Sequence, residues 1–166
     1  MTAGDDAQAW IDKSALTELV AKLAAAADRA DKDAIIDCYA PQSYDDHGAF
    51  KGSGSEFADM ICAPAGRAQQ LTMHHQLGQS IFEIHGDDAW GETFFVMHAL
   101  ITEQVTVGYG RYIDYFRRVG GGWKLAYRRV VPDVTIPGDD PAQYWQPRRD
   151  HTDPRHDHLT WPPDLR

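Results

Sequence analysis

The sequence predicts an α+β fold in which N-terminal helices cover a curved antiparallel sheet. Apolar residues recur at helical spacing in the first third of the chain, whereas the chain from residue 71 onward is rich in β-branched and aromatic residues separated by glycine-containing turns. Helices followed by hairpin-linked strands are the order typical of α+β domains. With 166 residues, the chain is long enough for one domain with a buried core and a small pocket.

Three helices are predicted in the N-terminal part. The first begins after an N-cap at Asp12 or Ser14, because aspartate and serine are residue types that cap helix starts. Its apolar residues recur at helical spacing and form one stripe: Leu16, Leu19, Val20, Leu23 and Ala27. A short second helix is predicted from residue 31 or 32 to residue 39, and a third over residues 55–66.

Four blocks after residue 70 are predicted to be strands. They read LTMHHQLGQSIFEI, AWGETFFVMHALITEQVTV, GRYIDYFRRV and WKLAYRRVVPDV. The intervening HGDD, GYG and GGG are hairpin signals, so the strands are expected to form an antiparallel meander. The first two blocks exceed the usual strand length of about 5–6 residues, which predicts a curved sheet with bulges near Gly78 and Gly91.

The second strand and the C-terminal tail predict an assembly. Both faces of TFFVMHAL are apolar, so we expect helices to cover one face and a second subunit or the tail to cover the other. A homodimer is the simplest outcome, with a trimer as the alternative. The tail from Pro132 holds seven of the nine prolines yet carries large aromatic residues. We therefore predict a domain over residues 1–136, with residues 137–166 as its ordered, extended arm across the subunit boundary or the pocket mouth.

Charge and composition exclude several classes of partner. The formal charge is -9, with 25 acidic against 16 basic residues, which disfavours a nucleic-acid partner. No apolar stretch approaches the roughly 18 residues of a membrane span, and the acidic N-terminus is unlike a secretory signal. Cys38 and Cys62 lie far apart and form no CxxC pair, so two reduced thiols and a cytoplasmic location are expected.

Two adjacent histidines in TMHHQLGQ raise the question of which one faces inward. Successive strand residues point to opposite faces, so one face carries His75, Leu77 and Gln79 and the other carries His74, Gln76 and Gly78. Asp28 falls at the edge of the apolar stripe of the first helix, where a carboxylate can reach a cavity rim, and Asp31 within the stripe is its rival. An imidazole held by a carboxylate is suited to remove a proton from carbon.

Five motifs follow one another along the chain: DRADKDAIIDCYAP, YDDHGAFKGS, HHQLGQ, GRYIDYFRRVGGGWKLAYRRVVPD and PRRDHTDP. Their order and spacing resemble the SnoaL-like branch of the nuclear transport factor 2-like superfamily, from about residue 12 to residue 158. The resemblance implies a sheet wrapped around three helices into a cone with a pocket at its mouth. Family members include scytalone dehydratase, bile-acid 7α-dehydratase and a dehydrochlorinase, together with non-catalytic proteins.

The resemblance also implies particular site residues. In the dehydratase and dehydrochlorinase members, a His–Asp dyad joins the end of the first helix to the first long strand, which here implies Asp28 and His75 as the catalytic pair. Gln79 stands where many relatives carry asparagine. His98 on the adjacent strand and the hydroxyl of Tyr44 are further candidates for substrate contact.

These observations predict a lyase or isomerase without cofactor or metal, acting on a hydrophobic cyclic or aromatic small molecule. Arg111 is a candidate to anchor a substrate carboxylate or carbonyl, with an interstrand ion pair as the leading alternative. The cluster in YDDHG does not predict a metal, because adjacent loop residues rarely converge on one ion.

The alternative function is a non-catalytic ligand-binding or assembly module, including one like a dioxygenase small subunit. A dyad within hydrogen-bond reach at an accessible cavity distinguishes the enzyme from that module.

Overall fold

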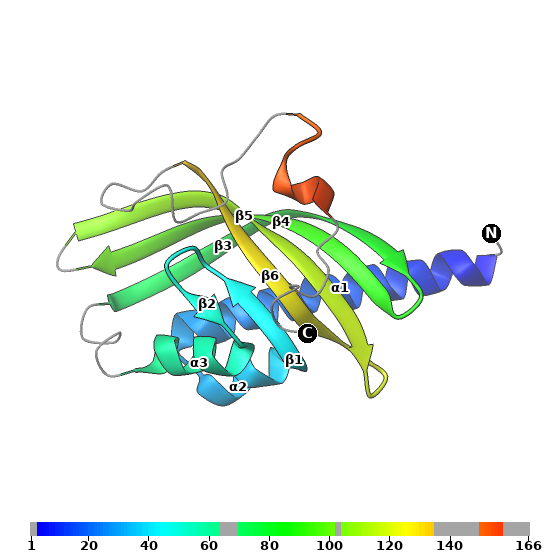
Figure 1. Cartoon of the computed structure of the whole chain (residues 1–166), viewed down its shortest axis with the longest axis horizontal. Helices are drawn as coiled ribbons and strands as arrows, with labels where there is room; N and C mark the ends of the chain where they lie inside the picture. The colour runs from blue at the N-terminus through cyan, green and yellow to red at the C-terminus, as the bar shows by residue number, and fades with distance from the viewer. Residues whose placement is uncertain (1–2, 64–69, 102–103, 135–149, 158–166) are drawn as a thin grey trace.

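Three helices lie on one side of a six-stranded sheet (Figure 1). The computed structural model describes residues 3–63, 70–101, 104–134 and 150–157. The helices are α1 (Ala3–Arg29), α2 (Lys32–Cys38) and α3 (Gly54–Cys62), and a 3-10 turn, η2, spans Pro154–Asp157. The strands are β1 (Tyr39–Asp46), β2 (Lys51–Gly52), β3 (Gln70–His85), β4 (Asp88–Ile101), β5 (Gln104–Val119) and β6 (Gly122–Val134).

The sheet is mixed and open, with the strand order β2-β1-β6-β5-β4-β3. Strands β3 to β6 pair antiparallel, as predicted, but GYG lies inside β5, so the hairpin predicted there is wrong and the second strand ends earlier, at Ile101. Strand β1 pairs with β6 in parallel. Hairpins enforce antiparallel pairing only between consecutive strands, and β1 is separated from β6 in sequence by β2, α3, β3, β4 and β5. The α+β prediction, a curved sheet with three N-terminal helices, is confirmed.

The two faces of the sheet are defined by its register, because residues directly opposite on neighbouring strands point to the same side. The inner face packs against the helices, and its rows include His75–Met97 and Thr93–Tyr112–Val130. The outer face is the opposite side, and its rows include His74–His98–Val107 and Phe94–Arg111–Val131. The inner face and the helices enclose the main core, in which Leu16, Ile35, Phe116 and Leu125 are fully buried.

The first helix starts earlier than predicted. It begins at Ala3, so Asp12 lies inside the helix instead of capping it. The Asp12 carboxylate is buried and accepts hydrogen bonds from Arg118 (2.9 Å) and from Trp123 Nε1 (3.0 Å). Burial raises the pKa of Asp12, but these hydrogen bonds outweigh it and leave the pKa below its ordinary value. An acid that reads as a cap in the sequence therefore ties α1 to the β5–β6 hairpin.

The other two helices have capped starts. Asp31 is the N-cap of α2, and its side chain accepts a hydrogen bond from the backbone N–H of Ala34 at 3.2 Å. Ser53 caps α3 in a capping box with Glu56. Since the Asp31 side chain serves the start of α2, it is not the residue that meets the β3 histidine.

Sheet curvature comes partly from β3. Its register with β4 shifts between Leu77 and Ser80, so the bulge predicted near Gly78 is confirmed. Pairing is regular at Gly91, so the bulge predicted there is wrong. Glycine is required at this position for space, because a Cβ would lie 2.8 Å from the ring of Phe82. None of the described helices is both long and apolar enough to cross a bilayer.

Candidate active site

One of the two adjacent histidines of β3 meets a carboxylate from α1. The Nδ1 atom of His75 lies 2.6 Å from Asp28 Oδ1, and the backbone N–H of His75 donates to Asp28 Oδ2 at 2.8 Å. The two side chains are 9% and 14% exposed. With both carboxylate oxygens engaged and Nδ1 occupied, Nε2 is the ring nitrogen left to exchange a proton with a ligand.

Asp28 lies where a helix disfavours a negative charge. It belongs to the last turn of α1, whose backbone carbonyls carry the negative end of the helix dipole. Burial raises the pKa of Asp28, but the side-chain and backbone hydrogen bonds from His75 outweigh it and hold the pKa below its ordinary value. Asp28 is therefore ionised at neutral pH and is able to fix the tautomer of His75 and stabilise its protonated ring.

His75 forms part of the wall of a cavity of about 200 Å³ between the helices and the inner face. The cavity is lined by Leu23, Ala24, Ala27, His47, Phe57, Met60, Ile61, Met73, His75, Met97, Tyr112 and Arg128. The small side chains of Ala24 and Ala27, from the AAAA run of α1, leave this space open beside the helix. An apolar cavity of about 150 Å³ is known to hold benzene, so this one accommodates a molecule of about one ring.

The cavity has one charged wall. Arg128 makes a two-pronged ion pair with the buried Asp114, with both nitrogen–oxygen distances at 2.8 Å. The Arg128 guanidinium carbon also lies 3.8 Å from the centre of the Tyr112 ring, which adds a cation–π contact. Burial raises the pKa of Tyr112, so its hydroxyl stays protonated. Positive charge and a phenolic donor are thus available on the inner face.

A second histidine at the cavity, His47, was not among the candidates predicted from the sequence. It sits in the turn between β1 and β2, where its backbone N–H donates to the Phe50 carbonyl and the backbone N–H of Gly48 donates to Asp46 Oδ1. Gly48 adopts a positive φ of 74°, which this tight turn requires. The turn folds the His47 ring over Phe57, with ring centres 4.7 Å apart. No strand was predicted over this segment, so the alternation that places Asp45 and His47 on one side was not applied to it.

Tyr44, the residue predicted from the same segment, faces the other way. It pairs with Tyr127 on β6, and the two rings meet edge to face at 5.4 Å in the second core cluster. Alternation along β1 sends Tyr44 to the outer face and the next residue, Asp45, to the inner face. The prediction that Tyr44 lines the His75 pocket is wrong in position.

Gln79 and His98 are also placed away from the cavity. The bulge after Leu77 changes the alternation, so Gln79 is exposed and contributes to a hollow shared with Phe94 and Tyr109. His98 lies opposite His74 on the outer face and is exposed, since its neighbour Met97 takes the inward position. The predictions that these two side chains share the cavity with His75 are wrong in position.

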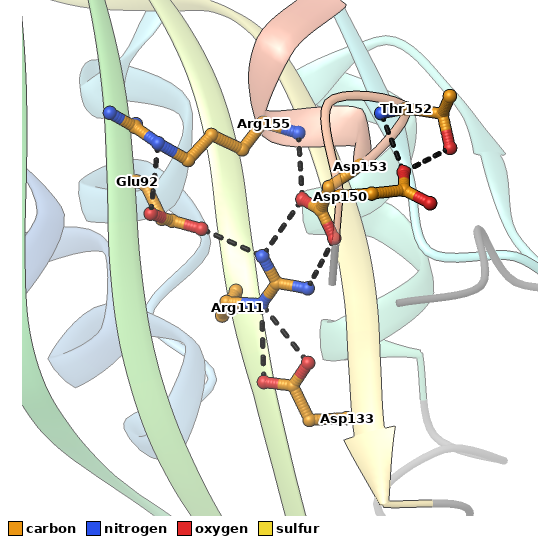
Figure 2. A network of polar contacts seen from close by, with 7 residues as sticks. All are labelled: Glu92, Arg111, Asp133, Asp150, Thr152, Asp153 and Arg155. Carbon is orange, nitrogen blue, oxygen red and sulfur yellow. Dashed lines mark hydrogen bonds and ion pairs between the residues drawn. The ribbon is translucent and has the colours of Figure 1, made fainter. Parts of the chain in front are cut away.

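Arg111 is the centre of an outer-face network (Figure 2). Its Nη1 donates to Glu92 at 2.7 Å and to Asp153 at 3.0 Å, its Nη2 donates to Asp153 at 3.1 Å, and its Nε donates to both oxygens of Asp133. The candidate role in substrate anchoring is not supported, because three carboxylates occupy the guanidinium on the face opposite the cavity. The leading alternative for Arg111, an interstrand ion pair, describes its contacts with Glu92 on β4 and Asp133 on β6.

The described part of the C-terminal arm lies on the same outer face. Asp153 reaches Arg111, and Arg155 approaches Glu83 and Glu92, each with a nitrogen–oxygen distance of 3.6 Å (Figure 2 shows the contact with Glu92). Figure 1 places this segment on the side of the sheet opposite the helices. Residues 150–157 therefore do not cover the His75 cavity, and the rest of the predicted arm lies outside the described residues.

Other hollows in the described structure offer less chemistry. A hollow of about 420 Å³ on the outer face is lined mainly by apolar residues with Gln76, Gln79 and Asp133 among them, and one of about 500 Å³ lies between α1 and β3. Neither is lined by a histidine. Within the described ranges, no three histidine, cysteine or acidic side chains are grouped as metal ligands. The smaller His75 cavity is the candidate active site because it combines apolar walls with paired titratable groups.

Known proteins that are similar to this chain share its fold. Residues 8–129 match the SnoaL-like domain. Similar solved structures include the hexachlorocyclohexane dehydrochlorinase LinA-type3 from Novosphingobium barchaimii LL02, with 15% identity, 80% and 94% of the two chains covered, and a TM-score of 0.71. A candidate scytalone dehydratase from Novosphingobium aromaticivorans DSM 12444 has 12% identity, coverage of 79% and 89%, and a TM-score of 0.69. A nuclear transport factor 2-like superfamily protein from Salmonella enterica has 16% identity, coverage of 76% and 94%, and a TM-score of 0.69. No curated protein sequence matches the chain.

Proposed function

Because the chain belongs to the SnoaL-like domain family, we propose that it is a lyase or isomerase that begins its reaction by removing a proton from carbon. His75 is the general base and Asp28 its orienting partner. The observation that carries the proposal is the contact of 2.6 Å between His75 Nδ1 and Asp28 Oδ1 at the wall of a cavity. This is the arrangement that distinguishes a catalytic site from an assembly module with a filled pocket.

The reaction would use the inner face in three ways. The Nε2 atom of His75 accepts the proton, and the Asp28 carboxylate stabilises the imidazolium that forms. Apolar walls from α1, α3 and β4 exclude water and orient a hydrophobic ring. Arg128 and Tyr112 stand in the same wall and supply positive charge and a hydrogen-bond donor where negative charge develops on the substrate.

The size of the cavity narrows the substrate class. A volume of about 200 Å³ is below the range of about 300–1,000 Å³ typical of drug-sized ligand sites. The substrate class that fits is therefore a small cyclic or aromatic molecule with a proton α to an electron-withdrawing group. The solved structures share this fold at low identity, and one of them is described as a hexachlorocyclohexane dehydrochlorinase, an enzyme that acts on a small ring.

The test uses 5-nitrobenzisoxazole, a single compact aromatic probe whose ring opens when one carbon-bound proton is removed. The coloured phenolate that forms would be followed for the wild type and for His75→Ala, Asp28→Asn and His85→Gln, the last being an exposed histidine on the same strand. We expect the first two variants to lose about 10²- to 10⁴-fold in rate while remaining folded at the assay temperature, and His85→Gln to keep the rate. Wild-type rates in folded His75→Ala and Asp28→Asn would contradict the assignment.

We infer that the protein also forms a homodimer through the outer face. Apolar side chains near the ends of β5 and β6 are exposed, among them Val105 (71%), Val134 (54%) and Tyr109 (49%). They border the outer-face hollow lined by Phe94 and Val96, and exposed apolar surface of this kind favours association. Light scattering at micromolar concentration should give a dimeric mass, and Tyr109→Lys should shift it toward the monomer. A monomeric mass for the wild type would contradict this inference.

The cytoplasmic location stays a prediction.

A further inference from the structure

The candidate active site contains a second imidazole held by a carboxylate. His47 Nε2 lies 2.7 Å from Asp45 Oδ1, and the Tyr39 hydroxyl donates a hydrogen bond to the other oxygen of Asp45. The Asp45 side chain is fully buried, whereas that of His47 is 27% exposed and lines the same cavity as His75. The pair comes from the β1–β2 turn, and His75 comes from β3, so two elements bring two histidine–carboxylate pairs to one small space.

The surroundings of His47 suit a proton donor. Asp45 offers a negative charge that stabilises a protonated ring, and its complete burial in the protein strengthens that attraction. The other charged pair facing this region, Arg128 with Asp114, is satisfied internally by two hydrogen bonds. Burial and the Asp45 charge raise the pKa of Tyr39 well above its ordinary value, so Tyr39 stays a hydrogen-bond donor to Asp45 and does not take over its role.

We propose that His47, held by Asp45, is the general acid of this site and protonates a leaving oxygen, so that the natural substrates are small cyclic β-hydroxy carbonyl compounds. The proposal rests on the proposed function of His75. A single base suffices when the leaving group departs as a stable anion, such as chloride or a carboxylate. A hydroxyl group leaves readily only when it receives a proton, and a second imidazole at the cavity supplies one.

The step balances in atoms and electrons. His75 Nε2 takes the α proton, and the electron pair of that carbon–hydrogen bond forms the new carbon–carbon double bond. The carbon–oxygen bond to the β hydroxyl breaks with its electron pair on oxygen, which takes a proton from the His47 imidazolium and departs as water. His75 ends protonated and His47 neutral, and exchange of one proton with solvent at each ring restores the starting state. No oxidant, reductant or other co-reactant is required.

The test compares two ketones that give the same product, cyclohex-2-enone, whose absorbance is followed. Loss of water from 3-hydroxycyclohexanone needs a general acid, and loss of acetate from 3-acetoxycyclohexanone does not. In His47→Gln, we expect water loss to slow by about 100-fold or more and acetate loss to change by less than about threefold. His75→Ala should slow both reactions, and the exposed-site variant His85→Gln should slow neither.

A second variant guards against a merely structural effect. His47→Ala leaves a space beside Asp45, and added imidazole should restore its water loss without accelerating acetate loss. Equal slowing of the two ketones in His47→Gln, no slowing of either, or no rescue by imidazole would overturn the assignment of His47. A His75→Ala variant that matches the wild type on both ketones would instead overturn the proposed base, and a wild type that forms enone from the acetate alone would overturn the β-hydroxy substrate class.

Discussion

The inner and outer faces of the sheet both bury charged side chains, but the two clusters differ in what their partners leave free. On the outer face, Arg111 donates to three carboxylates through all three of its guanidinium nitrogens. On the inner face, His75 uses one ring nitrogen for Asp28 and keeps the other at a cavity. A charged side chain whose nitrogens all donate to carboxylates holds strands together. A side chain that keeps one hydrogen-bonding atom at a cavity is able to act on a ligand.

The outer-face network also joins segments that are far apart in the sequence. The Arg111 network joins β4, β5, β6 and the C-terminal arm, and its partner Asp153 lies 42 residues away in sequence. Burial lowers the pKa of Arg111, but the hydrogen bonds to Asp153 and Glu92 outweigh it and raise the pKa. We therefore expect changes on the outer face to affect folding and changes on the inner face to affect turnover.

The largest effect on folding is expected from Arg111→Met. Glu92 and Asp153 are buried, so removal of the cation leaves two buried carboxylates without their main partner. Breaking a buried pair from one side costs about 3–5 kcal/mol, and urea denaturation at pH 7 would measure the loss in the free energy of unfolding. The matched control is Arg117→Met, because Arg117 and Asp88 form an ion pair with side chains 53% and 41% exposed. Exposed pairs contribute about 0.2–1 kcal/mol, and equal losses in the two variants would contradict the comparison.

A smaller effect is expected when only the arm loses its contact. In Asp153→Asn, Arg111 keeps Glu92 and Asp133, and the loss of charge-assisted hydrogen bonds is expected to cost about 1.5–3 kcal/mol. Release of the arm should also accelerate tryptic cleavage after Arg155, which now approaches Glu83 and Glu92. Mass spectrometry of timed digests would show it. Cleavage at the wild-type rate would mean that Asp153 does not hold this segment on the sheet.

Patterns that repeat along the chain were predictable from the sequence. Helical spacing located the helices, and HGDD and GGG located two of the three hairpins between the long strands, whereas GYG lies inside β5, where Gly110 packs closely against Phe95. Alternation along β3 assigned His75 and His74 to opposite faces. The same alternation assigned Gln79 to the wrong face, because the bulge after Leu77 inserts a change of register.

Features that depend on distant parts of the chain were not predictable in the same way. Asp12 has the residue type of a cap, and its role as an acceptor for Arg118 and Trp123 depends on how the β5–β6 hairpin docks. His47 is placed by the turn after β1, but the cavity that it lines is formed with residues of α1, α3 and β3 that lie far from it in the sequence. Nothing local in the sequence pairs Arg111 with Asp153, since the two meet only once the arm has folded back.

The inner pair gives a pH-dependent contribution to the free energy of unfolding. The pKa of Asp28 is lowered in the folded protein from its ordinary value of 3.8. A carboxyl group of this kind contributes stability above its unfolded pKa and loses that contribution as the pH falls through its folded pKa. The gap in unfolding free energy between the wild type and Asp28→Asn should therefore shrink as the pH falls from about 5 toward 3. Urea denaturation across this range would measure it, and a gap that stays constant down to pH 3 would contradict the ionised pair.

The smallest effect is expected from a histidine on the strand next to His75 whose side chain points away from the cavity. His98 is adjacent to Met97, whose side chain lines the cavity, yet His98 is exposed on the outer face opposite His74. His98→Gln should change the rate of 5-nitrobenzisoxazole opening by less than about threefold, because a side chain outside the cavity makes no contact that differs between substrate and transition state. A loss comparable with that of His75→Ala would show that an outer-face side chain takes part in turnover. The proposal that only the inner face carries the chemistry would then be wrong.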